Sequence, residues 1–160
     1  MGDANGGRTP PVRSTHPPAW LMGFANPVSR ALARTPAGRL FRSLVVLEFD
    51  GRRTGRHYAV PVMTYEYDGG LVAFTDARWA LNFTGGAPVV VRRHGRAHPG
   101  SALLAGADES AAGLRAVLAG LKSPGRLGLA VDEGHAPTDA ELAAARSMIR
   151  LTLDPPSGGR

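Results

Sequence analysis

The segment SLVVLEF-DGRRTGR-HYAVPVMTYEY-DGG-LVAFT (Ser43–Thr75) decides the fold of the chain. Three runs rich in β-branched and aromatic residues alternate with two turns that contain glycine, which is typical of consecutive antiparallel strands. The sequence predicts strands over 43–49, 57–67 and 71–75, with an Asp-Gly hairpin turn between the last two. The continuous apolar run Leu44–Leu47 predicts burial on both faces of the first strand.

The rest of the chain mixes short strand patterns with helical ones. Thr138 and Glu141 have the spacing of a capping box and mark the start of a helix, and residues 123–137 have the character of a long loop. The other expected elements are a helix over 27–34, a helical turn over 79–83, strands over 88–93 and 96–104, helices over 108–121 and 138–147, and a strand over 148–153. Meandering strands with tight turns favour an antiparallel barrel over a parallel sheet. The predicted class is α+β, a mostly antiparallel barrel with flanking helices.

Length and composition indicate one folded domain. The chain has 160 residues, of which 43% are hydrophobic, which suffices for one packed core. It contains no cysteine, and this excludes disulfides, thiolate metal sites and a thiol nucleophile. We expect a disordered tail over 1–17, one domain over 18–154 whose N-terminal helix lies within 18–36, and a tail over 155–160. Without a run of about 18 apolar residues or a secretory signal, a cytoplasmic location is expected.

The positive charge is concentrated in the first third of the chain. The net charge is +6, and residues 1–56 carry nine arginines against three acids, whereas residues 57–160 are balanced. Basic and aromatic residues do not interleave, so nucleic-acid binding is not expected. The segment 18–36 combines arginines with Trp20 and Phe24. It fits a peripheral contact with an anionic membrane, or a helix packed on the barrel.

The turn between the first two strands is the first candidate site. Arg52, Arg53, Thr54 and Arg56 crowd a short connection in which Gly51 and Gly55 permit close backbone approach. An anion between these cations would gain charge-assisted hydrogen bonds. The alternative is a hairpin turn whose arginines are solvated.

A second candidate lies in the expected helical turn. Trp79 and Asn82 are three residues apart and share one face of a helix. A tryptophan beside an amide could wall a flat ring and hydrogen-bond its edge. The alternative is that Trp79 fills core space and Asn82 caps the turn.

The order of these elements resembles a known family. The turn Gly51–Arg56, the sequence Val60-Pro61-Val62, the Asp-Gly hairpin, Trp79-x-x-Asn82 and Ala87–Val91 together resemble the deazaflavin-dependent nitroreductase family, within the flavin-binding split β-barrel superfamily. The likeness covers residues 38–120 and 148–153. It implies an FMN-binding split-barrel-like fold, and a homodimer with cofactor sites near its interface.

The resemblance also implies a cofactor and its contacts. The cofactor would be coenzyme F420, with FMN as the alternative. Its phosphate and acidic tail would be held by Arg52, Arg53, Thr54, Gly55 and Arg56. The ring would lie against Pro61, Val62, Met63, Thr75, Arg78, Trp79 and Asn82. Asp76 would place a carboxylate near that phosphate unless Arg78 pairs with it.

The implied activity is that of an F420H2-dependent oxidoreductase. Reduced deazaflavin would transfer a hydride to an unsaturated small-molecule substrate such as an enone or a quinone. Tyr58, Tyr65 and His135 are the candidates to protonate the product. An FMN-dependent oxidoreductase and a non-catalytic flavin or deazaflavin carrier are the alternatives. No metal site is expected, because three convergent ligands are not visible in the sequence.

Overall fold

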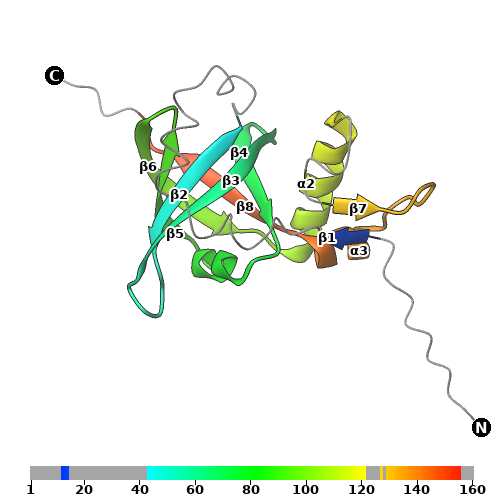
Figure 1. Cartoon of the computed structure of the whole chain (residues 1–160), viewed down its shortest axis with the longest axis horizontal. Coiled ribbons are helices and arrows are strands. Elements are labelled where there is room, and N and C mark those ends of the chain that lie inside the picture. The colour runs from blue at the N-terminus through cyan, green and yellow to red at the C-terminus, as the bar shows by residue number, and fades with distance from the viewer. Residues whose placement is uncertain (1–11, 15–42, 122–126, 128, 156–160) are drawn as a thin grey trace, which may run out of the picture.

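Six antiparallel strands form a closed barrel in this computed structural model, which describes residues 12–14, 43–121, 127 and 129–155 (Figure 1). The strand order around the barrel is β2-β3-β4-β8-β6-β5. The strands are β2 (Leu44–Asp50), β3 (His57–Tyr67), β4 (Gly70–Thr75), β5 (Ala87–Arg93), β6 (Arg96–Leu104) and β8 (Ser147–Leu153). The predicted antiparallel barrel with flanking helices is confirmed.

The meander β2-β3-β4 has the predicted form. Asp50 pairs with His57 at the base of the first turn, and Tyr67 pairs with Gly70 at the second. Burial alternates along β2, because Val45 and Leu47 are buried whereas their neighbours are only half-buried. The prediction that both faces of Leu44–Leu47 are buried is therefore wrong: one face fills the barrel and the other lines its outer wall.

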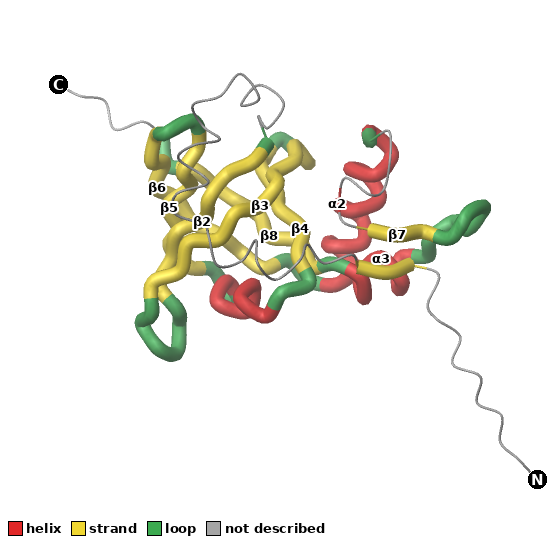
Figure 2. The backbone as a smooth tube through the Cα atoms, in the orientation of Figure 1, coloured by secondary structure: helices red, strands yellow, loops and turns green. Residues whose placement is uncertain are grey.

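The barrel closes through pairs distant in sequence. β5 pairs with both β2 and β6, and β8 lies between β4 and β6. β8, the last strand of the described residues, therefore fills the gap between two earlier hairpins. Figure 2 shows these strands as one closed wall beside the helices.

One end of the barrel is plugged by a 3-10 helix, η3 (Arg78–Phe83), which confirms the predicted helical turn over 79–83. Phe83 and Ala80 are buried in the barrel core. Phe83 packs edge-on against Phe49, with ring centroids 4.8 Å apart. This aromatic contact fixes η3 beside the turn that joins β2 to β3.

A second core lies outside the barrel wall. It is built by α2 (Ala107–Gly120), α3 (Asp139–Ala145) and a two-stranded sheet of β1 (Val12–Ser14) and β7 (Leu129–Val131). Gly113 lets α2 approach the barrel, because a Cβ there would collide with the Met148 Sδ.

The β1–β7 sheet differs from the sequence predictions. Val12 lies in the segment expected to be a tail, and Leu129 lies in the expected loop, yet both are buried in the second core. Each strand has only three residues, too few for the alternating pattern that identifies a strand. The two strands form because they pair with each other across the chain.

Some expectations lie outside the described residues. They are the helix over 27–34, the membrane contact through 18–36 and, except for its first residue, the tail over 155–160. Within the described part of the chain, no helix is long and apolar enough to cross a membrane.

Candidate functional site

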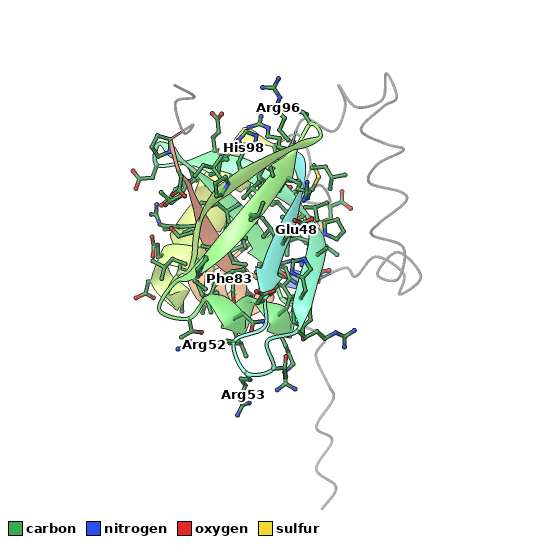
Figure 3. The ribbon with its side chains drawn as sticks, turned by 90° about the vertical axis from the view of Figure 1, so that its left-hand side faces the viewer. Glu48, Arg52, Arg53, Phe83, Arg96 and His98 are labelled. Atoms are coloured by element: carbon green, nitrogen blue, oxygen red, sulfur yellow. The ribbon has the colours of Figure 1, made fainter. Side chains whose placement is uncertain are left out.

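A pocket of about 570 Å³ lies at the barrel end that η3 plugs. Its lining comes from the β2–β3 turn, the start of β3 and η3: Gly51, Arg52, Arg53, Thr54, Tyr58, Arg78, Leu81 and Asn82. Figure 3 shows Arg52 and Arg53 at this end of the barrel and Arg96 at the opposite end. Two candidates that were separate in the sequence therefore share one pocket.

The turn is ordered by its own backbone. The Gly55 N–H donates to the Gly51 carbonyl and the Gly51 N–H donates to the Arg56 carbonyl, both at 2.7 Å. Gly55 has φ +64°, a conformation that glycine adopts without strain. The Thr54 hydroxyl oxygen accepts from the Arg56 N–H at 3.3 Å. The tip therefore has a defined shape although its side chains are exposed.

Gly51 is required by close packing. A Cβ at this position would lie 2.8 Å from Cε2 of Tyr58 and 3.0 Å from Oγ1 of Thr54. The Tyr58 ring stacks on Phe49 with centroids 5.3 Å apart. The glycine thus allows the wall of the pocket to lie directly on the aromatic cluster beneath it.

Asn82 connects the turn to η3. Its Oδ1 accepts from the Arg52 N–H at 2.8 Å, and its Nδ2 donates to the Trp79 carbonyl at 2.8 Å. Both ends of the amide are therefore used within the protein. Asn82 is not a cap of η3, whose C-cap is Thr84; its side chain instead holds the turn against the helix.

The arginines of the pocket are not equivalent. Arg52 Nη1 donates to the Thr84 carbonyl at 2.7 Å, which ties its side chain to the end of η3. Arg56 lies over the Tyr58 ring, 5.9 Å from its centroid, and does not line the pocket. Within the described residues, the guanidinium groups of Arg53 and Arg78 make no hydrogen bond or ion pair. These two cations are the ones available to a ligand.

The acids at this end of the barrel are paired. Asp50 Oδ1 lies 3.0 Å from His57 Nδ1 at the base of the turn. Asp76 Oδ1 lies 3.1 Å from Arg146 Nη1, so the ion-pair partner considered for Asp76 in the sequence, Arg78, is replaced by a residue 70 positions further on. Neither acid is part of the pocket lining, which contains three arginines among the described residues.

Trp79 belongs mainly to the core. It is half-buried, and its ring lies 5.9 Å from Phe49 and 6.2 Å from Phe83. These contacts favour the core-filling interpretation. In agreement with it, Trp79 is not part of the pocket lining.

The structure does not bring every predicted site residue to the pocket. Pro61 and Met63 lie on the outer wall of β3, and Val62 and Thr75 are buried in the barrel, Thr75 accepting from the Ala77 N–H. Tyr65 packs in the second core, 6.0 Å from Phe74. His135 bonds to Glu141 of α3, and α3 lies at the far end of the molecule from the β2–β3 turn (Figure 1). Of the three candidate proton donors, Tyr58 alone lines the pocket.

One lining residue was not predicted. Leu81 is 57% exposed on η3 and gives the cationic pocket an apolar wall. The signal in the sequence was its position between Trp79 and Asn82, the two residues already proposed to face a ligand. Within the described ranges, no group of three or more His, Asp or Glu side chains is placed to hold a metal ion.

Among known proteins, the chain is similar only to solved structures. No family model and no curated protein matches the chain. The chain is similar to the general stress FMN/FAD binding protein from Xanthomonas citri, with 19% identity, a TM-score of 0.43, and coverage of 73% of this chain and 82% of that one. It is also similar to the FAD and heme binding protein from Mycobacterium smegmatis, with 21% identity, a TM-score of 0.43, and coverage of 71% and 62%. At these values the likeness does not extend to a ligand of this chain.

Proposed function

We propose that the chain binds the phosphate of a flavin-type cofactor in the pocket beside η3, and that this cofactor is coenzyme F420, with FMN as the alternative. The observation that carries the proposal is the lining of the pocket: among the described residues it contains three arginines and no acid, and the guanidinium groups of Arg53 and Arg78 make no hydrogen bond or ion pair there. Such an arrangement favours an anionic ligand.

The pocket has the size and chemistry for part of such a cofactor. Ligand pockets have volumes of about 300–1,000 Å³ and combine apolar walls with a few polar groups, and this one combines Leu81 and the Tyr58 ring with arginines and a hydroxyl at about 570 Å³. Arg53 and Arg78 would bind phosphate oxygens, and Thr54 Oγ1 can donate a further hydrogen bond. Arg52 and Asn82 hold the turn in place for them.

The proposed activity is hydride transfer to an unsaturated organic substrate such as an enone or a quinone. The cofactor supplies the hydride when bound, and the protein supplies binding and orientation. Tyr58 would deliver a proton to the product, and its position in the pocket wall supports this role. Membership of the deazaflavin-dependent nitroreductase family, a homodimer and a cytoplasmic location, with membrane contact through 18–36, belong to the same proposal.

A non-catalytic carrier is the second candidate. Apart from the Tyr58 phenol, no acid or imidazole lines the pocket among the described residues. A site that only binds a flavin or deazaflavin needs no proton donor, so this lining favours a carrier as well as a reductase whose product takes its proton from water.

One set of titrations tests both candidates. Purified protein is mixed separately with F420, FMN, FAD and haem, and binding is followed by cofactor fluorescence or absorbance. Binding of F420 or FMN with a dissociation constant below about 100 µM, a free energy beyond about −5 kcal/mol, is expected. Weaker binding of all four ligands contradicts the proposal, and tight binding without turnover of enones or quinones identifies the carrier.

A further inference from the structure

The β5–β6 hairpin carries basic side chains to the end of the barrel opposite the pocket, where Figure 3 labels His98. Its turn has positive φ at residues 94 and 95, which is typical of a tight two-residue hairpin. In the resulting register Arg93 faces Arg96. Two positions further from the turn, Val91 faces His98. Opposite residues of an antiparallel pair, and residues two apart on one strand, share a face of the sheet. Val91 is fully buried in the barrel core, so Arg93 and His98 lie on the inward face.

Arg93 has no partner among the described residues. Its Nε is buried and forms no hydrogen bond. The residue opposite it, Arg96, is another cation. On the adjacent strand, the carboxylate of Glu48 lies on the outer face, where it pairs with Arg92 at 2.6 Å. In native proteins a buried charged donor nearly always has a partner, because leaving it without one costs free energy.

His98 is the diagonal neighbour of Arg93 on this inward face. Such neighbours lie about 7–8 Å apart, within reach of long side chains. The imidazole is half-buried, and within the described part of the chain it makes no hydrogen bond or ion pair. The Nη groups of Arg93 make none there either, and they are not among the buried unpaired atoms, so they are open to solvent. Glu66 and Asp154, the exposed acids at this end, bond to neither residue.

We propose that Arg93 and His98 form a second anion site, at the mouth of the barrel opposite the pocket, for a carboxylate or phosphate group. A guanidinium matches the paired oxygens of both groups, and an imidazole N–H can donate a further hydrogen bond. The Nε side of Arg93 is already withdrawn from water, so water screens its charge less than that of an exposed arginine. The site goes beyond the proposed function. An anion that binds there, and not to the unfolded chain, stabilises the barrel.

A site-resolved NMR titration tests the proposal. Inorganic phosphate and acetate are added separately at constant ionic strength, with chloride as the reference salt. The amide of residue 93 reports on the mouth, and the amide of Gly55 reports on the pocket. We expect phosphate to shift the residue 93 amide with a dissociation constant below about 10 mM. A matching shift with acetate shows that a carboxylate is also a ligand, and its absence restricts the site to phosphate.

The two signals separate this inference from the proposed function. If phosphate and acetate shift the residue 93 amide no more than chloride does, the second site is overturned, even where the Gly55 amide responds to phosphate. If the residue 93 amide alone responds, the second site stands and phosphate binding in the pocket fails.

Substitutions then identify the groups that bind. Arg93→Met should weaken phosphate binding at the mouth about tenfold, equivalent to about 1.4 kcal/mol, and His98→Leu about threefold, about 0.7 kcal/mol. The control is Arg92→Met, which removes the same charge from the outer face of the same hairpin and should change affinity less than about twofold. Equal losses in Arg93→Met and Arg92→Met would overturn the site, since only the general charge of the hairpin would then matter. Unchanged affinity in Arg93→Met or His98→Leu would also overturn it. If Arg93→Met does not fold, Arg93→Gln replaces it with the same expected loss.

Discussion

Gly51 shows how one residue type shapes the pocket. It is buried between Tyr58 and Thr54, and its backbone forms two bonds across the turn. We predict that Gly51→Ala destabilises the protein by about 1–3 kcal/mol, because the added methyl group overpacks against the Tyr58 ring. The midpoint of urea unfolding measures this change.

A matched glycine provides the control. Gly120 is exposed at the end of α2, and a methyl group added there would meet no atom within 4 Å. Gly120→Ala should be neutral or stabilising by up to about 1 kcal/mol, since alanine is the better helix former. Equal unfolding midpoints for the two variants would mean that Gly51 has more room than its contacts indicate.

At the scale of elements, Asn82 couples the β2–β3 turn to η3. We predict that Asn82→Ala speeds hydrogen exchange of the Arg52 amide about tenfold or more, because the acceptor worth about 1.4 kcal/mol of protection is removed. Exchange of single amides is followed by NMR.

A second substitution identifies the cause. Asn82→Asp keeps an oxygen acceptor for the Arg52 N–H but removes the donor to the Trp79 carbonyl. The Arg52 amide should therefore stay protected in this variant. The Thr64 amide, which donates to the Ser43 carbonyl at the other end of the barrel, should not change in either variant. Unaltered Arg52 exchange in Asn82→Ala would show that the turn holds its shape without η3.

The capping box of α3 gives a prediction about pH. The pKa of Glu141 is lowered from its ordinary value, first by the Thr138 backbone N–H and then by the His135 ring. A lowered folded-state pKa means that the unfolded chain binds more protons, so stability rises with pH. The contribution of Glu141 is fully present above the unfolded pKa of about 4.3 and is lost as the pH falls through the lower folded value.

Unfolding at acid pH tests this contribution. Urea midpoints of wild type and Glu141→Gln are compared between about pH 5.5 and pH 3, below the ordinary titration range of imidazole. The urea midpoint of wild type should exceed that of Glu141→Gln, and this difference should shrink as the pH falls. A difference in midpoint that stays constant over this pH range would contradict a lowered pKa of Glu141 in the folded protein.

The sequence predicted those elements whose signals are local. The hairpin turns at Asp68 and His94, the strands on either side of them and the Thr138–Glu141 capping box are each specified by adjacent residues. The β1–β7 pairing was missed because Val12 and Val131 meet only in the folded chain. The Asp76–Arg146 ion pair was missed for the same reason, since it follows from the place of β8 beside β4.

At the scale of the whole molecule, the two ends of the barrel differ. One end carries the β2–β3 turn, η3 and the pocket, and the other carries the β5–β6 hairpin with Arg96 (Figure 3). The sequence located the pocket cations Arg52, Arg53 and Arg78, but not their division of roles. Arg52 is structural because its side chain donates to the Thr84 carbonyl, whereas Arg53 makes no such bond among the described residues. No local pattern in the sequence specifies where that carbonyl lies.

The most direct test of the phosphate pocket compares two exposed arginines from these opposite ends. Arg53→Ala and Arg96→Ala each remove one positive charge, so they alter the net charge equally. The dissociation constants of F420 and FMN are measured for both variants. We predict that Arg53→Ala weakens binding about tenfold or more, through loss of a charge-assisted bond of about 1.5–3 kcal/mol, while Arg96→Ala leaves it unchanged. Equal effects of the two substitutions would contradict phosphate binding at the β2–β3 turn.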